Sequence, residues 1–214
     1  MTVISAAILT DNVDVYKQQI ERLQGVIENV HIDFSDGEFA PTLTIGAQDI
    51  WWPKEWKAAI HAMVARPSEH VAALVKLKPD IIILHAEASE DITPAIQFIQ
   101  QSGIRAGVAL FKTTVPLQVK SLIEAADHVM IFSGDLGHHG GTASLMQLEK
   151  VRLIKAIRPN VEIGWDGGVT VDNAFSLSQG GVDVLNVGGV FEKSEDVKET
   201  YTQLNREISK RSVI

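Results

Sequence analysis

The sequence predicts a single (β/α)8 barrel, or TIM barrel, over residues 1–214. Eight short apolar runs alternate with segments of helical periodicity, which is the pattern of this fold. A chain of 214 residues with this spacing leaves no room for a second domain. Ionisable residues follow several predicted strands, and a barrel gathers those strand ends around one mouth. A doubly wound sheet is the alternative, but it usually has fewer strands at this length and does not explain that gathering.

The first half of the chain contains four predicted strands. Residues 3–9 form an apolar run with one serine, which suits a strand buried on both faces. The first helix begins among polar residues 11–14 and ends at Gly25. Similar signals predict strands over 26–34, 58–64 and 80–86, helices over 13–24, 67–76 and 92–101, and a short helix or turn within 42–50.

The second half repeats the alternation. Residues 144–157 have a strong amphipathic pattern that ends before Pro159. A loop rich in glycine and histidine, residues 133–143, precedes this helix. We expect strands over 106–111, 128–132, 161–165 and 182–187, and helices over 117–125, 144–157, 171–179 and 196–210.

Three of the four tryptophans lie within residues 51–56. Such a cluster is either a packing corner beneath a shortened helix or an exposed aromatic patch at a subunit interface. The sequence leaves both interpretations open.

Composition limits the classes of partner. Hydrophobic residues make up 45% and charged residues 21%, as in ordinary globular proteins. The net charge of −8 argues against nucleic acid. It does not exclude a phosphorylated small molecule, because backbone N–H groups can bind phosphate without net positive charge. The sequence has no cysteine, which excludes disulfides, thiolate catalysis and cysteine-ligated metal sites.

The N-terminal residues do not resemble a targeting segment. They lack a basic region and reach Asp11 too early for a signal peptide. No apolar run approaches the roughly 20 residues that span a bilayer. We therefore expect a cytoplasmic protein with no membrane partner.

Ionisable side chains stand where three predicted strands end. His31 and Asp33 are two residues apart, so both point to the same face of their strand. Burying such groups is costly unless they are paired or ligated. With His61 and Asp166 they could hold one divalent ion. This nitrogen and oxygen ligand set suits Zn²⁺, Mn²⁺, Fe²⁺ or Co²⁺, and the sequence does not choose among them.

Two further polar residues, His85 and Glu87, follow the strand over 80–86. They either orient the metal ligands from behind or are polar residues of the rim. The sequence leaves these alternatives open.

Two glycine pairs suggest a phosphate site. The pair 167–168 follows the seventh strand, and the pair 188–189 follows the eighth. In TIM barrels the loops after these two strands frequently bind phosphate through backbone N–H groups. Tight turns also need glycine, so one pair is weak evidence, and two pairs in these loops are stronger evidence.

Several segments match motifs of one known family. Segment 31–46, His-Ile-Asp-Phe-Ser-Asp-Gly-Glu-Phe-Ala-Pro-Thr-Leu-Thr-Ile-Gly, is similar to H-x-D-x-M-D-G-x-F-V-P-N-x-T-x-G. Weaker matches are His61-Ala-Met-Val64 with Pro67 to H-L-M-V-x-x-P, His85-Ala-Glu87 to H-x-E, Trp165-Asp-Gly-Gly-Val169 to V-D-G-G-V, and Asn186-Val-Gly-Gly-Val-Phe191 to V-A-G-S-A-x-F. The first and the Asp-Gly-Gly motif are specific. Together they resemble the ribulose-phosphate 3-epimerase family in register over residues 3–191.

The resemblance implies a barrel of the ribulose-phosphate-binding type with particular roles for its residues. The metal would be held by His31, Asp33, His61 and Asp166, and the two aspartates would be the acid and base catalysts. It also suggests a homo-oligomer. The substrate- and phosphate-binding residues that we expect are Thr10, Met63, Gly140, Gly141, Gly167, Gly168, Gly188 and Gly189.

The sequence departs from the family motifs around the substrate. Where the first strand of the family reads P-S-I-L-S, residues 6–10 read Ala-Ala-Ile-Leu-Thr, so one hydroxyl is lost and Thr10 keeps the other. The family's M-x-V-N-P-G-F-G-G-Q loop is replaced by residues 132–142, whose His138 and His139 are either solvated or new substrate contacts. These changes concern the identity of the substrate more than the class of reaction.

We therefore expect a metal-dependent epimerase that inverts C3 of a ketose phosphate through an enediolate. The substrate would be D-ribulose 5-phosphate, giving D-xylulose 5-phosphate, or a related ketose phosphate. The alternatives are a metal-assisted aldolase or hydrolase on a phosphorylated substrate, and a non-catalytic barrel that binds a sugar phosphate.

Overall fold

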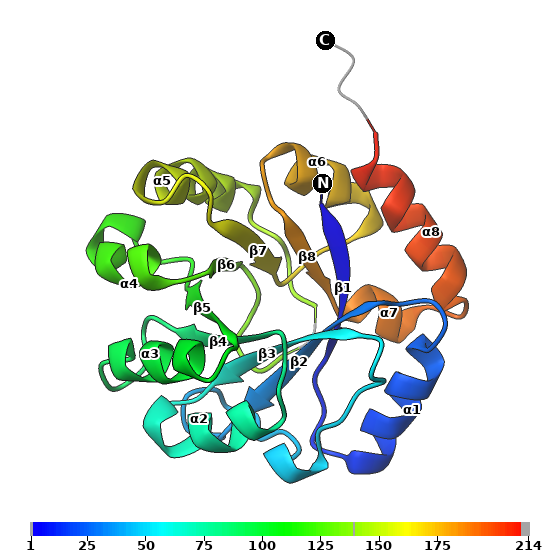
Figure 1. The fold of residues 1–214 in the computed structure, drawn as a ribbon. Coiled ribbons are helices and arrows are strands. Elements are labelled where there is room, and N and C mark those ends of the chain that lie inside the picture. The colour runs from blue at the N-terminus through cyan, green and yellow to red at the C-terminus, as the bar shows by residue number, and fades with distance from the viewer. Residues whose placement is uncertain (1, 139, 211–214) are drawn as a thin grey trace.

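The computed structural model, which describes residues 2–138 and 140–210, contains a closed barrel of eight parallel strands. The strands pair in chain order, and β1 closes the barrel by pairing with β8 (Figure 1). This architecture confirms the predicted fold. The strands are β1 (Val3–Ile8), β2 (Asn29–Ser35), β3 (Lys57–Met63), β4 (Ile81–His85), β5 (Arg105–Leu110), β6 (His128–Phe132), β7 (Glu162–Asp166) and β8 (Val184–Val187).

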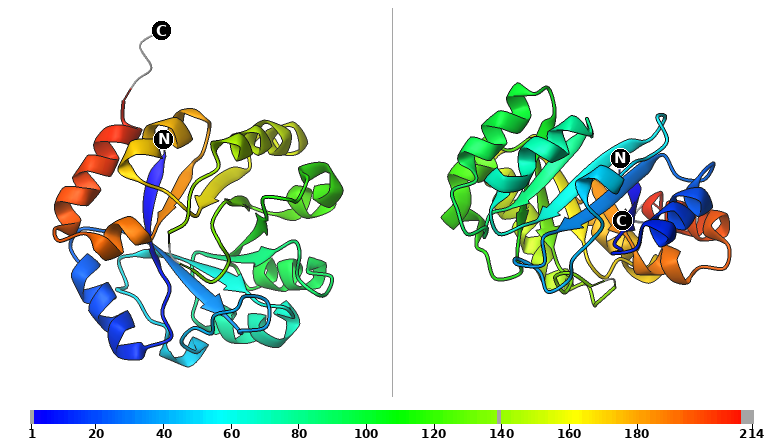
Figure 2. Two further views of the ribbon diagram at one scale, coloured as in Figure 1. Left: turned by 180° about the vertical axis from the view of Figure 1, so that it is seen from behind. Right: turned by 90° about the horizontal axis from the view of Figure 1, so that it is seen from below.

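Helices surround the barrel, as the views from behind and from below show (Figure 2). They are α1 (Val13–Leu23), α2 (Pro67–Lys76), α3 (Thr93–Gln101), α4 (Lys120–Ala125), α5 (Glu149–Ile157), α6 (Val171–Gln179), α7 (Gly189–Lys193) and α8 (Val197–Ile208). Short 3₁₀ helices lie at Ala47–Asp49, Pro116–Val119 and Leu145–Leu148. Within the segment 42–50, the helix is the 3₁₀ helix Ala47–Asp49. The predicted helices over 117–125 and 144–157 each begin as a 3₁₀ helix and continue as an α-helix. Across the described residues, no helix combines the length and apolar character that crossing a membrane requires.

The helix that follows β7 begins with a capping box. The Thr170 hydroxyl accepts a hydrogen bond from the Asn173 N–H, and the Asn173 side chain accepts one from the Thr170 N–H. Reciprocal caps of this kind satisfy N–H groups that the first helical turn leaves free. The cap fixes the start of α6 directly after the predicted glycine turn at 167–168.

The hydrophobic core has two parts. The larger part lies between the barrel and its helices and includes Tyr16, Leu74 and Trp165. A smaller cluster comprises Ile81, Ile83, Ala109, Met130 and Phe132. Several of these residues are two apart on their strands, as expected for side chains that share one face.

The tryptophan cluster is mainly a packing corner. Trp56 is buried and Trp52 packs against the core, whereas 43% of Trp51 is exposed. The Trp51 carbonyl accepts a hydrogen bond of 2.6 Å from the Tyr16 hydroxyl, and the two rings meet edge to face. The corner therefore fastens α1 to the segment before β3.

A candidate metal centre at the barrel mouth

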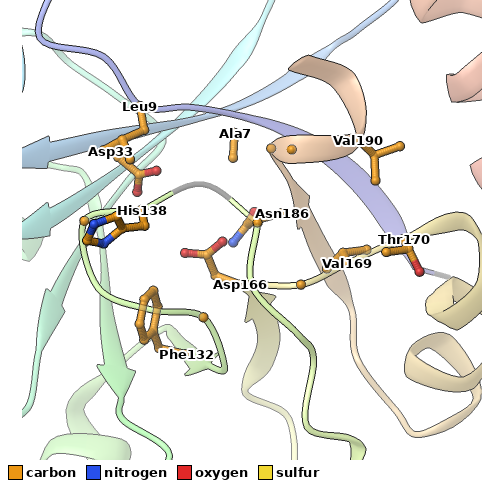
Figure 3. Close-up of a pocket in the computed structure, with 18 of the residues that line it drawn as sticks. Ala7, Leu9, Asp33, Phe132, His138, Asp166, Val169, Thr170, Asn186 and Val190 are labelled. Carbon is orange, nitrogen blue, oxygen red and sulfur yellow. The ribbon is translucent and has the colours of Figure 1, made fainter. Parts of the chain in front are cut away.

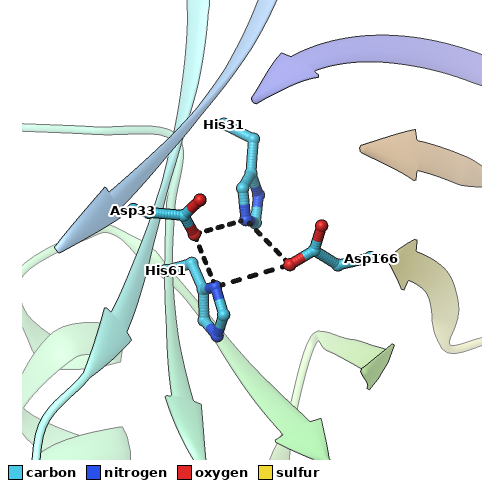
Figure 4. Close-up of side chains that lie close together, drawn as sticks. All are labelled: His31, Asp33, His61 and Asp166. Atoms are coloured by element: carbon cyan, nitrogen blue, oxygen red, sulfur yellow. Dashed lines mark hydrogen bonds and ion pairs between the residues drawn. The ribbon is translucent and has the colours of Figure 1, made fainter. Parts of the chain in front are cut away.

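Four side chains from three strands converge near the C-terminal end of the barrel. His31 and Asp33 come from β2, His61 from β3 and Asp166 from β7. Asp33 and His61 are register partners on neighbouring strands. One ligand atom from each of the four residues lies within 4.8 Å of all the others (Figure 4). The barrel therefore brings together residues that lie up to 135 positions apart in the sequence, from 31 to 166.

The atoms that face one another identify the potential ligands. His61 Nδ1 lies 2.8 Å from Asp33 Oδ1 and 3.7 Å from Asp166 Oδ2. His31 Nε2 lies 3.4 Å from Asp33 Oδ1 and 3.9 Å from Asp166 Oδ2. Both imidazoles are fully buried, and the two aspartates are 9% exposed. Two nitrogens and two carboxylate oxygens thus surround one point.

The two carboxyl groups have different proton affinities. Burial raises the pKa of Asp33, but contacts with His31 and His61 outweigh burial and hold this pKa well below its usual range. Burial raises the pKa of Asp166, and the nearby Asp33 charge raises it further, against the effect of the two imidazoles. The environment therefore gives Asp33 a lower pKa than Asp166, which is the asymmetry that paired acid and base chemistry uses.

The residues fit a divalent metal ion. Both ring nitrogens of His31 are buried and have no hydrogen-bond partner among the described residues. Buried polar atoms without a partner are rare, and those in native structures often mark an ion or water site. A set of nitrogen and oxygen ligands without sulfur is suitable for Zn²⁺, Mn²⁺, Fe²⁺ or Co²⁺. The His/Asp group could therefore hold one such ion.

A chain of hydrogen bonds supports His61 from behind. His61 Nε2 lies 2.8 Å from His85 Nε2, and His85 Nδ1 lies 3.3 Å from Glu87 Oε2. Glu87 in turn accepts hydrogen bonds from the Phe111 N–H and the Thr114 hydroxyl. This chain fixes the His61 ring so that Nδ1 faces the carboxylates.

A cavity of about 460 Å³ opens above the four side chains. Asp33 and Asp166 point into it from opposite sides (Figure 3). The predicted substrate-binding residues that line it are Met63, Gly140, Gly141, Gly167, Gly168, Gly188 and Gly189. Thr10 is not among the lining residues, since its hydroxyl accepts the Asn12 N–H at 3.1 Å in the turn before α1.

Three glycine pairs meet along one wall of this cavity. A Cβ atom on Gly167 would lie 2.0 Å from the Gly134 nitrogen, and one on Gly168 would lie 2.1 Å from the Ala143 nitrogen. The Gly168 N–H donates to the Gly140 carbonyl at 2.9 Å. Gly167 and Gly168 also have positive φ angles of 96° and 71°, which side chains disfavour. The loop after β6 therefore lies directly on the turn after β7.

Some lining residues were not predicted from the sequence. Asn186 and Lys193 are two of them. His138, for which the sequence left a substrate contact open, also lines the cavity, and its ring donates to the Leu136 carbonyl at 3.0 Å. A polar Asn186 in an otherwise apolar strand is a signal that could have been used, whereas nothing in the sequence distinguishes Lys193 from other surface lysines. His139 lies outside the described residues.

The fold and this centre define a class, the (β/α)8 barrels with a His/Asp site at the mouth. A family model described as the ribulose-phosphate 3 epimerase family matches residues 3–191. The chain belongs to this family, which confirms the resemblance. The protein is therefore an enzyme of the isomerase class.

Individual relatives agree with this assignment. A ribulose-phosphate 3-epimerase of Helicobacter pylori is 33% identical over 176 residues, covering 79% of this chain and 81% of that protein. The corresponding protein of Bacillus subtilis is 26% identical and covers 85% and 87%. Among solved structures, 3-hexulose-6-phosphate synthase from Salmonella typhimurium aligns with a TM-score of 0.74 at 15% identity, covering 97% and 98%. At that identity the structural likeness shows the fold alone.

Proposed function

We propose that this chain is a metal-dependent epimerase that inverts C3 of a ketose phosphate. The substrate is D-ribulose 5-phosphate, which becomes D-xylulose 5-phosphate, or a related ketose phosphate. The observation that carries the proposal is the pair Asp33 and Asp166, which point into one cavity from opposite sides of the barrel mouth. The relatives named ribulose-phosphate 3-epimerase support the choice of substrate.

The two carboxyl groups suit a proton transfer with inversion. The proton on C3, next to the C2 ketone, leaves from one face of the sugar and a proton returns to the opposite face. Asp33 accepts the proton as a carboxylate and Asp166 donates from the other side in one direction, and the roles exchange in the reverse direction. General acid and base groups contribute roughly 10² to 10⁴ in rate when they are positioned in this way.

The ligands of the metal are His31, Asp33, His61 and Asp166. A bound divalent ion supplies positive charge that stabilises the negative charge developing on the substrate oxygens. His85 and Glu87 are positioning residues, because they hold the His61 ring through its second nitrogen. The glycines at 167–168, 188–189 and 140–141 form one wall of the cavity, where the phosphate would bind.

The oligomeric state, the location and the partners of the enzyme are part of the same proposal. A homo-oligomer is expected, and light scattering on the purified protein tests it. A cytoplasmic location is expected as well, and the net charge of −8 argues against a nucleic-acid partner.

The test is solvent exchange at C3. Protein loaded separately with Zn²⁺, Mn²⁺, Fe²⁺ or Co²⁺ is incubated with D-ribulose 5-phosphate in D₂O, and the sugar is analysed by NMR. We expect deuterium at C3 together with the appearance of D-xylulose 5-phosphate. Cleavage of the sugar or release of phosphate would instead indicate an aldolase or hydrolase. Binding without exchange of this or related ketose phosphates would indicate a non-catalytic barrel.

A further inference from the structure

A second cavity, here called the base cavity, opens at the opposite end of the barrel interior. Its volume is about 190 Å³. The first residues of the strands line it, including Asn29, Arg105 and Val184, and so do His31, His128 and Asn186. His31 therefore lies between the two cavities, with Nε2 directed towards the carboxylates at the mouth (Figure 4).

Three buried polar atoms that belong to residues lining the base cavity have no hydrogen-bond partner within the described part of the chain. They are His31 Nδ1, His128 Nε2 and Asn186 Oδ1. The three side chains are 0%, 3% and 3% exposed. An unsatisfied buried polar group costs roughly 1–3 kcal/mol, so three of them beside one cavity are unexpected unless something in it binds them.

The orientation of each group is fixed from its other side. His128 Nδ1 lies 2.8 Å from Glu162 Oε1, and its ring lies over Gly164, where a Cβ would be 2.4 Å from Nε2. The Asn186 amide nitrogen donates to the Met130 sulfur at 3.4 Å, and Oδ1 has no donor in the part of the chain that the structure describes. These contacts hold both side chains in place without satisfying the three remaining atoms.

The hydrogen-bonding requirements of the three atoms indicate what kind of molecule binds in the base cavity. With His31 Nε2 turned towards the carboxylates as a metal ligand, Nδ1 carries the proton and requires an acceptor. Asn186 Oδ1 requires a donor, and so does His128 Nε2 when its ring is neutral. Water both accepts and donates, whereas an anion would repel the amide oxygen. A cavity of about 190 Å³ has room for several waters at about 30 Å³ each.

We infer that the base cavity holds a cluster of ordered waters that accepts the Nδ1 proton of His31. His128 and Asn186 anchor this cluster and are therefore positioning residues for His31. The inference deepens the proposed function, because it rests on His31 as a metal ligand. The water cluster and the His31 tautomer can nevertheless be measured in protein without metal or substrate.

The first test is a high-resolution crystal structure of the metal-free protein. We expect ordered waters within hydrogen-bond distance of His31 Nδ1 and of at least one of Asn186 Oδ1 and His128 Nε2. A dry cavity, a bound anion, or a protein atom bonded directly to His31 Nδ1 would overturn the inference. This measurement uses the unaltered chain, so it does not depend on whether a variant folds.

The second test changes His128, which lines the base cavity and not the mouth cavity. In His128→Leu we expect Zn²⁺ affinity, measured by competition with a chelator, to fall about tenfold, as for other outer groups that orient a metal ligand. In metal-free protein, ¹⁵N NMR should show a shift in the tautomer populations of His31, because Nδ1 loses its acceptor. His128→Gln, whose amide can still bind water, should restore most of the affinity.

Ile83→Val is the matched control, because Ile83 lines the same cavity with an apolar side chain. It should leave Zn²⁺ affinity and the His31 tautomer unchanged. Equal losses in His128→Leu and Ile83→Val would indicate a purely structural effect and contradict the inference. If the waters and the tautomer are observed but no C3 exchange occurs, only the proposed function fails. If exchange occurs but the tautomer does not respond, only the present inference fails.

Discussion

The mouth and the base of the barrel interior both contain buried polar groups, but the partners of these groups differ between the two ends. At the base, Glu162 contacts both His128, at 2.8 Å, and Arg105, at 3.1 Å. At the mouth, the ion-pair contacts of Asp33 and Asp166 in the described residues are with two neighbouring imidazoles, and none is with a lysine or arginine.

This difference separates a region built for stability from one built for chemistry. A carboxylate that is hydrogen-bonded to an imidazole and a guanidinium stabilises the fold wherever its pairing is strong. Two carboxyl groups within 4.8 Å of each other oppose folding unless a cation joins them. In TIM barrels generally, catalytic residues gather at the C-terminal end of the strands, and the opposite end contributes stability.

The largest effect should follow from changing either carboxyl group at the mouth. In Asp33→Asn or Asp166→Asn we expect kcat for C3 epimerisation to fall about 10² to 10⁴-fold, because one proton carrier is lost. Thermal unfolding should show that both variants remain folded, since each removes half of a repulsive pair. Asp11→Asn, at an exposed position outside the cavity, is the control. Wild-type kcat in either mouth variant would refute the two-base mechanism.

The next largest effect concerns the glycine wall of the mouth. Gly167→Ala adds a Cβ at a positive φ and only 2.0 Å from the Gly134 backbone. We expect the free energy of unfolding to fall by about 3 kcal/mol and KM for the sugar phosphate to rise about tenfold. Denaturant titration and steady-state kinetics measure the two quantities.

Gly25→Ala separates backbone strain from the clash. Gly25 has a similar φ of 77°, but a Cβ there would meet nothing within 4 Å. This variant should lose only about 1 kcal/mol and keep its KM. Equal losses in the two variants would mean that the loop after β6 can move away from the turn after β7 at little cost.

The fold could be predicted because parallel strands buried on both faces produce continuous apolar runs, and glycines mark where elements end. The His/Asp cluster at the mouth could be predicted for a related reason. His31 and Asp33 share a face because they are two residues apart, and a barrel brings the ends of β3 and β7 to the same mouth.

The rest of the site depends on details that a periodic pattern does not specify. Ala7 and Leu9 line the mouth cavity, so the alternation of side chains turns Thr10 away from it. The base cavity depends on the stagger of eight strands, which places His128 over Gly164 and leaves Asn186 Oδ1 without a partner among residues 2–138 and 140–210. Neither arrangement follows from the order of residues within one strand.

An intermediate effect is expected at the base, as a dependence of stability on pH. The Glu162 carboxylate accepts a hydrogen bond from His128, which lowers the pKa of Glu162 to about 2, compared with 4.5 in an unfolded chain. Burial raises this pKa, and the charge of Arg105 lowers it further. The unfolded chain therefore binds more protons between these values. The contribution is present above pH 4.5 and is lost as pH falls towards 2. Since the Glu162 side chain is 34% exposed, we expect about 1–2 kcal/mol after screening.

Glu162→Gln tests this contribution by urea unfolding at several pH values. The variant should be less stable than the wild type at pH 7, and the difference should shrink as pH falls towards 2. Glu195→Gln, at an exposed site away from the barrel interior, should show no such trend. A difference that is constant with pH would indicate that Glu162 contributes through packing and not through its charge.

The smallest effect is expected from replacing an exposed lysine at the mouth, compared with an exposed lysine at the base of the barrel. Lys193 lines the mouth cavity and Lys57 lines the base cavity, and neither forms an ion pair within residues 2–138 and 140–210. In Lys193→Gln we expect KM for the sugar phosphate to rise about 1.4- to fivefold, which corresponds to the 0.2–1 kcal/mol of an exposed ion pair. The rise should fade in 1 M salt because exposed charges are screened. Lys57→Gln should leave KM unchanged, and an equal rise in both variants would show that the net charge of the chain, and not the position of Lys193, attracts the phosphate.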